Sequence, residues 1–343
     1  RGDRTGRGGR VKILIVGAGL YGSVLGRALA EGGHRVHIID RRDHIAGNCF
    51  DRVNRHGIRV HAYGPHIFHT ANQRVIDYVT CHSDWIAYRH RVRARLSDGR
   101  LVPLPVNRET LRAVPRDQVV DVLFRPYSRK MWGMDLDALD PSIAARVPVD
   151  DDAPDDYFAK DHFVGFPTDG YSALVAEILR HPRVSIDLET PFEHGVEAGY
   201  DLCFNSMSID AFFDFRLGRL PYRSIRFHEV HLPESRVFPF PVVNFTDDGP
   251  FTRVTEWKNF PGHGAGADGT TVTFEEPCAA DENDFERYYP IKDRAGANRA
   301  LYRRYLQLVP AGMTFIGRTG MYTYLDMDQA ISSALALAAK VTH

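Results

Sequence analysis

Apolar positions near the start of the chain follow the pattern of a strand, a helix and a second strand. The first apolar run covers residues 11–16, and the second ends at Asp40. Between them, apolar residues at helical spacing follow a glycine-rich turn. Two strands joined by such a helix form one βαβ unit, so the pattern predicts this unit over residues 11–41.

The pattern further along predicts an interrupted α/β arrangement. Helical spacing appears at 170–179, and strand-like runs follow at 184–188 and 201–204. Alternating runs over 222–274 predict an antiparallel sheet. The C-terminus then supplies a strand and turn at 314–318 and an alanine-rich helix at 328–340.

A nucleotide-binding domain that resumes at the C-terminus around an inserted antiparallel sheet is typical of FAD-binding oxidase-like folds, whereas nicotinamide dehydrogenases keep this domain contiguous. The fold class predicted is therefore α/β: an FAD-binding Rossmann-like domain, an inserted antiparallel β-sheet domain and a reduced helical domain. We place a disordered tail at 1–10 and the FAD-binding domain at 11–75 with 168–215 and 311–343. The helical substrate domain with a mobile loop is placed at 76–167, and the sheet substrate domain at 216–310.

Composition narrows the classes of function. The 343 residues exceed what one hydrophobic core usually holds, and 43% hydrophobic with 25% charged residues is ordinary for a globular enzyme. A formal charge of −1 gives no net attraction to nucleic acid or a membrane surface. No apolar run reaches the length of about 18 residues that spans a bilayer. Four scattered cysteines suit a reducing compartment, so we expect a cytoplasmic protein.

The glycine-rich turn carries the first candidate chemistry. Gly17, Gly19 and Gly22 have the G-x-G-x-x-G spacing between a strand and a helix. In such a turn the first glycine permits the tight bend, the second lets backbone amides approach a pyrophosphate, and the third lets the helix pack closely. Asp40, at the end of the second strand, is placed to bind an adenosine ribose. These positions predict a dinucleotide site.

Arginine and tyrosine are concentrated in turn-like settings elsewhere in the chain. Guanidinium groups and phenol hydroxyls together suit a diphosphate, because they neutralise its charge and bind its oxygens. Tyr127 and Trp132 offer flat faces for a nucleobase or a sugar. The alternative for each residue alone is a surface ion pair or an aromatic core position. The other candidates of this kind are Arg146, Arg253, Tyr288, Tyr289, Arg318, Tyr322 and Tyr324.

Longer strings make the chain resemble the bacterial UDP-galactopyranose mutases over about residues 11–340. The strings occur in the order of that family, and several are long and unusual. They include Tyr-Gly-Pro-His-Ile-Phe-His-Thr, Pro-Leu-Pro-Val-Asn, Tyr-Ser-Arg-Lys-x-Trp-Gly, Ala-Arg-Val-Pro, Tyr-Tyr-Pro-Ile and Tyr-Leu-Asp-Met-Asp-Gln.

The resemblance implies an isomerase that uses FAD in its reduced form without net redox change. In this family, reduced flavin attacks the anomeric carbon of the nucleotide sugar through N5, and the adduct opens and recloses between pyranose and furanose forms. It also implies a nucleotide-sugar substrate and an external reductant, either NADPH or a reductase. UDP-galactose is the default substrate.

Carried over by motif, the resemblance assigns roles to individual residues. The expected catalytic residues are Arg253, Arg318, Asp326 and His66. The expected substrate-binding residues are Arg146 on a mobile loop, Tyr127, Trp132, Tyr157, Tyr289 and Tyr324. The expected cofactor-binding residues are Gly17, Gly19, Leu20, Gly22, Asp40, Arg41, Asn48, His66, Gly317, Arg318, Asp326 and Met327.

The histidines near residue 66 have a second interpretation. His61, His66 and His69 could form a metal cluster, but no carboxylate or thiolate completes a ligand set at suitable spacing. We therefore expect no metal. His66 is predicted to contact flavin or substrate, and His69 to order the loop.

Three departures from the family pattern affect these expectations. The family has several helices between the Pro-Leu-Pro-Val-Asn and Tyr-Ser-Arg-Lys-x-Trp-Gly strings, but here only residues 108–126 separate them. The identity of the nucleotide and the oligomeric state are therefore left open. Met207 stands where the family has a glycine beside the flavin, a costly exchange unless the loop moves. Trp257 and Asn259 replace two histidines and are expected to reshape the sugar end.

These departures leave the substrate open to another nucleotide or a deoxysugar. Two functions from other classes also stay open. One is an amine-oxidase-like flavin oxidoreductase, and the other is a nucleotide-sugar binding protein without catalysis.

Overall fold

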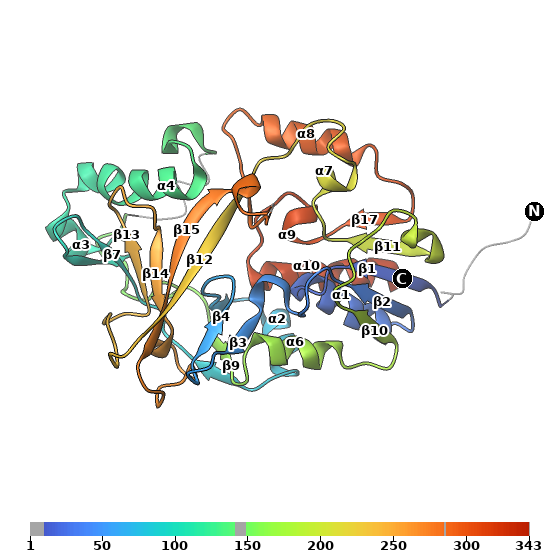
Figure 1. Ribbon diagram of the computed structural model, residues 1–343, viewed down its shortest axis with the longest axis horizontal. Coiled ribbons are helices and arrows are strands. Elements are labelled where there is room, and N and C mark those ends of the chain that lie inside the picture. The colour runs from blue at the N-terminus through green and yellow to red at the C-terminus, as the bar shows by residue number, and fades with distance from the viewer. Residues whose placement is uncertain (1–9, 141–148, 285, 343) are drawn as a thin grey trace, which may run out of the picture.

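The parallel sheet and the long antiparallel strands lie next to each other in the computed structural model (Figure 1). The structure describes residues 10–140, 149–284 and 286–342. The predicted tail therefore falls almost entirely outside the described residues.

The first sheet is entirely parallel and confirms the Rossmann-like prediction. Its strand order places the first strand at the centre, and its last strand comes from near the C-terminus, as the interrupted layout predicts. From edge to edge the strands are β10 (Val184–Asp187), β2 (Arg35–Ile39), β1 (Lys12–Val16), β11 (Leu202–Asn205) and β17 (Met313–Phe315).

Both faces of this sheet are buried. Successive side chains of a strand point to opposite faces, so each strand contributes to two cores. Ile13 and Ile15 of β1 join one core, while Leu14 and Val16 join another. The first core is shared with α1 (Leu20–Glu31), α6 (Tyr171–Leu179) and α10 (Met327–Thr342), and the second with α7 (Ile209–Phe212) and α8 (Ala297–Leu306). A continuous apolar strand is what such double burial requires.

The second sheet has seven strands, and all neighbours but one pair are antiparallel. Its long strands β12 and β15 run between the parallel sheet and the helices α3 and α4 in Figure 1. The exception is the parallel pair of β13 with β7. In spatial order the strands are β16 (Tyr289–Pro290), β12 (Tyr222–Leu232), β15 (Thr270–Ala279), β14 (Arg253–Glu256), β13 (Val242–Phe245), β7 (Val92–Arg95) and β8 (Leu101–Leu104).

The segment predicted as a helical unit, 76–167, contains strands as well as helices. β7 and β8 extend the seven-stranded sheet, and β6 (Trp85–Ala87) and β9 (Phe163–Pro167) pair with β5 (Phe68–Thr70) in a separate sheet. The helical part consists of α3 (Arg108–Ala113), a π-helical stretch Val120–Phe124 and α4 (Arg125–Trp132). The domain boundaries stay a prediction. The remaining elements are β3 (Asp51–Val53), β4 (Arg59–His61), α2 (Gln73–Thr80) and α9 (Gly317–Gly320).

The ends of α4 have local causes that place its aromatic residues. Pro126 lies in the first turn, where a missing N–H costs nothing. Gly133 follows the helix with a φ of 64°, a left-handed conformation that glycine adopts without strain. Tyr127 and Trp132 thus lie at opposite ends of a short, well-defined helix.

Candidate functional site

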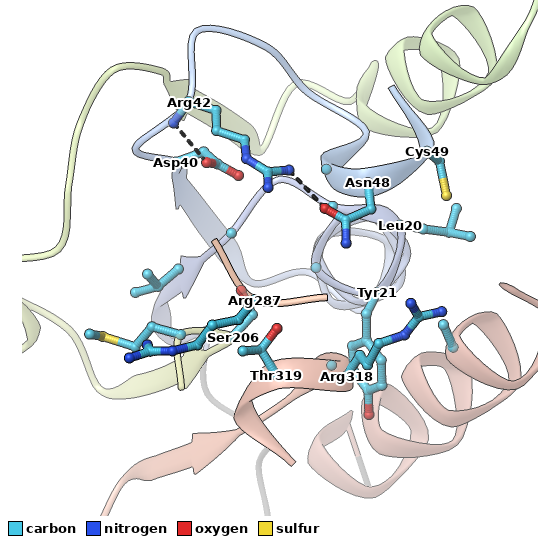
Figure 2. Close-up of a pocket in the computed structure, with 18 of the residues that line it drawn as sticks. Leu20, Tyr21, Asp40, Arg42, Asn48, Cys49, Ser206, Arg287, Arg318 and Thr319 are labelled. Carbon is cyan, nitrogen blue, oxygen red and sulfur yellow. Dashed lines mark hydrogen bonds between the residues drawn. The ribbon is translucent and has the colours of Figure 1, made fainter. Parts of the chain in front are cut away.

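A cavity of about 490 Å³ opens at the carboxyl ends of the parallel strands, beside the start of α1. In Figure 2, Asp40, Arg42 and Asn48 lie on one side of it, opposite Ser206, Thr319 and Arg318. All of the predicted cofactor-binding residues line this cavity: Gly17, Gly19, Leu20, Gly22, Asp40, Arg41, Asn48, His66, Gly317, Arg318, Asp326 and Met327.

Two glycines of the turn are required by sterics. Gly17 has a φ of 109°, and a Cβ there would lie 2.0 Å from the Ser206 Oγ atom. A Cβ on Gly22 would lie 2.1 Å from the Gly17 carbonyl oxygen. Without these side chains, α1 begins close to β1, and its first-turn N–H groups border the cavity. Such a helix start favours a phosphate group.

Asp40 already holds the backbone around the cavity. Its Oδ2 atom accepts a hydrogen bond from the Ala18 N–H at 2.8 Å, and its Oδ1 atom accepts one from the Arg42 N–H at 3.0 Å. Each carboxylate oxygen can accept a further hydrogen bond. The geometry therefore leaves room for the ribose contact expected from the sequence, which stays a prediction.

Arg42 is a cavity residue that the sequence interpretation missed. Its guanidinium donates to Asn48 Oδ1 at 3.0 Å, pairs with Glu286 at 2.9 Å and lies 4.3 Å from the centre of the Tyr63 ring. Arg41, the predicted neighbour, has a 58% exposed side chain and pairs with the same Glu286. No spacing rule separates two adjacent arginines, so only the structure distinguishes them. Further lining residues that were missed are Phe192, Ser206, Arg287 and Thr319.

Met207, which stands where the family has a glycine beside the flavin, lines the cavity in a relaxed backbone conformation. Its φ lies outside the left-handed region, and its N–H donates to Asn205 Oδ1 at 2.9 Å. Its side chain packs against the core below the sheet. The cost expected of methionine here concerns the close approach of the turn to the flavin, so it stays a prediction.

The expected substrate residues form a second cluster at one end of the cavity. Tyr289 and Tyr324 stack with ring centres 5.9 Å apart, and the Arg318 guanidinium lies 5.2 Å and 4.6 Å from these two rings. Trp132 meets the Tyr289 ring edge-on at 6.2 Å. Arg318 is fixed by a 2.8 Å hydrogen bond to the Leu325 carbonyl.

Arg253 approaches the same cluster from β14. Its Nε atom lies 2.7 Å from the Glu275 Oε1 atom across the β14–β15 pair, and Glu275 is 2% exposed. Burial raises the pKa of Tyr127, and the charge of Arg253 opposes that rise, which places the two side chains near each other. The buried Glu275 carboxylate thus holds Arg253 in place near Tyr127.

His66 lies where the two parts of the site meet. Burial lowers the pKa of His66 to about 4. A hydrogen bond to the Gly64 carbonyl raises this pKa, whereas the positive charges of Arg318 and Arg253 lower it further. The charges of both arginines thus reach His66, and the catalytic role expected of these three residues stays a prediction. Arg146, an expected substrate-binding residue, lies outside the described residues.

Other predicted residues lie around this centre. Tyr157 is 37% exposed and interacts electrostatically with Tyr127. His69 pairs with Asp161 at 2.7 Å and stacks on Phe158 at 3.7 Å, as expected of a residue that orders a loop. Cys49 borders the cavity, and burial raises the pKa of its thiol to about 12, so it is protonated at neutral pH.

Trp257 and Asn259, which differ from the family pattern, lie outside the lining of the cavity. Trp257 is fully buried and donates to Thr273 Oγ1 at 2.8 Å. Asn259 donates to the carbonyls of Phe238 and Phe240. Neither residue lines the cavity, so any effect on the sugar end passes through the residues in front of them.

Comparison with known proteins identifies the family to which the chain belongs. A family model described as UDP-galactopyranose mutase matches residues 122–324, and one described as NAD(P)-binding Rossmann-like domain matches residues 15–81. A probable UDP-galactopyranose mutase of Klebsiella pneumoniae is 36% identical over 365 aligned positions, which cover 95% of this chain and 93% of that protein. The chain belongs to the UDP-galactopyranose mutase family.

Another relative is named for a different substrate. The dTDP-fucopyranose mutase of Escherichia coli is 33% identical, with 95% of this chain and 97% of that protein covered. A crystal structure of reduced UDP-galactopyranose mutase has a TM-score of 0.77 at 16% identity, covers 96% of this chain and 93% of that one, and shows a shared fold. The 365 positions aligned to the Klebsiella protein outnumber the 343 residues here, so the alignment contains gaps in this chain.

Membership of this family indicates an isomerase with a flavin cofactor.

None of the helices in the described part of the chain has the length and apolar character to span a bilayer.

Proposed function

We propose that this member of the UDP-galactopyranose mutase family is an FAD-dependent nucleotide-sugar mutase that interconverts pyranose and furanose forms. The observation that carries the proposal is the cluster of Arg253, Arg318, Tyr289 and Tyr324 at the end of a dinucleotide-type cavity. An oxidase of small amines has no need for two arginines and two phenols that together suit a diphosphate.

The residues around the cavity fit FAD. The start of α1 suits the pyrophosphate, and Asp40 the ribose. Apolar side chains suited to a flat ring line the cavity beside Arg318, namely Leu325, Met327 and Ala330. When bound and reduced, FAD supplies the nucleophile for the sugar without net redox change. The electrons would come from NADPH or a separate reductase.

The chain itself would hold the substrate and exclude water. Arg253 and Arg318 would neutralise the diphosphate, both while it is bound to the sugar and while it is the leaving group. The hydroxyls of Tyr289 and Tyr324 would donate to its oxygens. Tyr127 and Trp132 would contact the nucleobase and the sugar, with Tyr157 at the same end. Asp326 and His66 would face the reacting sugar and the flavin.

The residues of the site indicate the type of reaction more directly than the identity of the substrate. UDP-galactose is the default, but a relative named for dTDP-fucopyranose covers as much of this chain as the Klebsiella protein does. The short helical part, α3 to α4, alters the region beside Tyr127 where the base would bind. We therefore place a thymidine nucleotide or a deoxysugar beside UDP-galactose as candidates.

The test is an anaerobic turnover assay with the purified holoenzyme. UDP-galactofuranose and dTDP-fucofuranose are supplied separately to dithionite-reduced and oxidised protein, and pyranose formation is followed by HPLC beside the flavin spectrum. We expect turnover only after reduction, with one substrate clearly preferred. A yellow protein that consumes oxygen with a substrate and isomerises nothing would favour an oxidoreductase. A colourless protein that still binds nucleotide sugar would favour a binding protein.

A further inference from the structure

Three histidines form a continuous hydrogen-bond chain behind the cavity. The His66 backbone N–H lies 3.0 Å from His61 Nδ1, and His61 Nε2 lies 3.1 Å from His263 Nε2. His263 Nδ1 lies 2.8 Å from the Pro261 carbonyl oxygen. His61 and His263 are each only 2% exposed, so the chain lies in the protein interior.

The fixed donor and acceptor at its ends determine where the protons are. A backbone N–H can only donate, so His61 Nδ1 carries no proton. Neutral His61 must then be protonated at Nε2, which donates to the bare Nε2 of His263. A carbonyl oxygen can only accept, so His263 is protonated at Nδ1. One arrangement of protons satisfies every contact.

The same reasoning settles the ring of His66. Its Nδ1 atom lies 2.8 Å from the Gly64 carbonyl oxygen and must donate to it. A neutral ring then carries no proton on Nε2, which is the nitrogen left for a ligand because His66 lines the cavity. The positive charges of Arg253 and Arg318 nearby disfavour a second proton on this ring.

We propose that His61 and His263 are positioning residues that hold His66 as a neutral hydrogen-bond acceptor at the cavity. The ligand group that His66 Nε2 takes must be a donor: an N–H of the flavin or an O–H of the sugar. The catalytic consequence rests on the proposed mutase function, whereas the proton arrangement does not.

The surroundings explain why the chain of histidines keeps its geometry. Trp257 lies 4.9 Å from the His61 ring and nearly parallel to the His263 ring at 6.3 Å, so it packs against both. His263 lies in the segment that follows β14, close to Trp257 and Asn259, which stand where the family has two histidines. Trp257 therefore acts through His61 and His263 on His66, which fits its place behind the cavity.

The test combines a spectroscopic readout with kinetics. In holoenzyme with ¹⁵N-labelled histidine rings, NMR reports which nitrogen of each ring carries the proton, and single substitutions assign the signals. We expect Nδ1–H at His66 and His263 and Nε2–H at His61. His263→Leu removes the acceptor for His61 and should disturb the signals of His61 and His66, whereas His263→Gln keeps an acceptor and should restore them. His231→Leu, at a half-buried position near the end of β12, is the matched control and should leave these three rings unchanged.

Kinetics then identify the donor. His263→Leu should lower kcat about tenfold, and His263→Gln should recover most of it. A changed flavin midpoint potential in His66→Leu would identify the flavin N–H, and an unchanged potential with altered kcat or KM would identify the sugar. A proton on His66 Nε2 in the wild type would overturn the proposal, as would equal rates in His263→Leu and wild type. If the wild type isomerises no nucleotide sugar, the proposed function fails, while the ring signals still decide the proton arrangement.

Discussion

At the scale of single residues, Arg253 gives the sharpest prediction about the diphosphate. Arg253→Ala removes one charged contact of about 1.5–3 kcal/mol, so KM should rise and kcat fall, with kcat/KM lower by at least about tenfold. Arg253→Lys keeps the charge but loses the fork of donors and should give an intermediate value. The measurement is steady-state kinetics of the reduced enzyme.

The neighbouring strand pair offers a matched control for this prediction. Arg226 pairs with Glu276 across β12 and β15, as Arg253 pairs with Glu275 across β14 and β15, but Arg226 is 39% exposed and outside the aromatic cluster. Arg226→Ala should therefore leave kinetics unchanged. Because Arg253→Ala also leaves a buried carboxylate unpaired, Tm is measured in parallel. Unchanged kinetics in Arg253→Ala would remove this residue from the site.

Individual site residues could be predicted where a motif imposes a physical requirement. Gly17 and Gly22 were identified because the turn leaves no room for a Cβ. Arg42 was missed because its role depends on Glu286, more than 240 positions away in the sequence. The cost expected of Met207 stays a prediction, because it concerns the approach of the turn to the bound flavin and not the φ angle of the turn.

At the scale of elements, a two-pronged ion pair holds the loop over residues 149–162 beside β7. Arg93 of β7 donates to both carboxylate oxygens of Asp155 at 2.6 Å and 2.8 Å, and its guanidinium lies 4.0 Å from the Phe240 ring centre. Two residues later, the Tyr157 N–H donates to the His90 carbonyl at 2.7 Å. The pair thus positions the loop that places Tyr157 beside Tyr127.

Asp155→Asn should loosen this loop and weaken substrate binding. An amide cannot accept two charge-assisted hydrogen bonds from one guanidinium, so Tyr157 loses its support. We expect KM to rise about three- to tenfold while kcat changes less, since the residues around the flavin stay in place. Asp152→Asn is the control, because the pair of Asp152 with Arg108 is largely exposed. An equal KM in both variants would show that the ion pair does not position the loop.

Elements were predictable where local periodicity is strong. The helix expected at 170–179 is α6, and Leu174, Val175, Ile178 and Leu179 are all buried on it. The strands β7 and β8 were not predicted within the segment expected to be helical. β7 pairs with β13, which lies about 150 residues later, and β8 pairs with β7 at the edge of the sheet. Such long-range pairing leaves no periodic signal in a short segment interrupted by proline.

At the scale of the whole molecule, the cavity joins segments from both ends of the chain. It is lined by the β1–α1 turn, by residues 206–208, by Glu286 and Arg287, and by the start of α10. A ligand that fills it contacts all of these segments in the folded state and none of them in the unfolded chain. Binding must therefore stabilise the fold by mass action.

Removing FAD should therefore lower Tm, and adding it back should raise Tm again, with a stabilisation that grows as the logarithm of the free FAD concentration above Kd. At one hundred times Kd the stabilisation should reach about 2.7 kcal/mol, measured by thermal unfolding of the apoprotein over a series of FAD concentrations. NAD is the matched control, because it shares the adenosine diphosphate half but lacks the isoalloxazine ring. A Tm that rises with FAD and hardly with NAD would support a flavin site. An equal rise with both would mean that the cavity recognises only the adenosine diphosphate, and the flavin-dependent function would lose its structural basis.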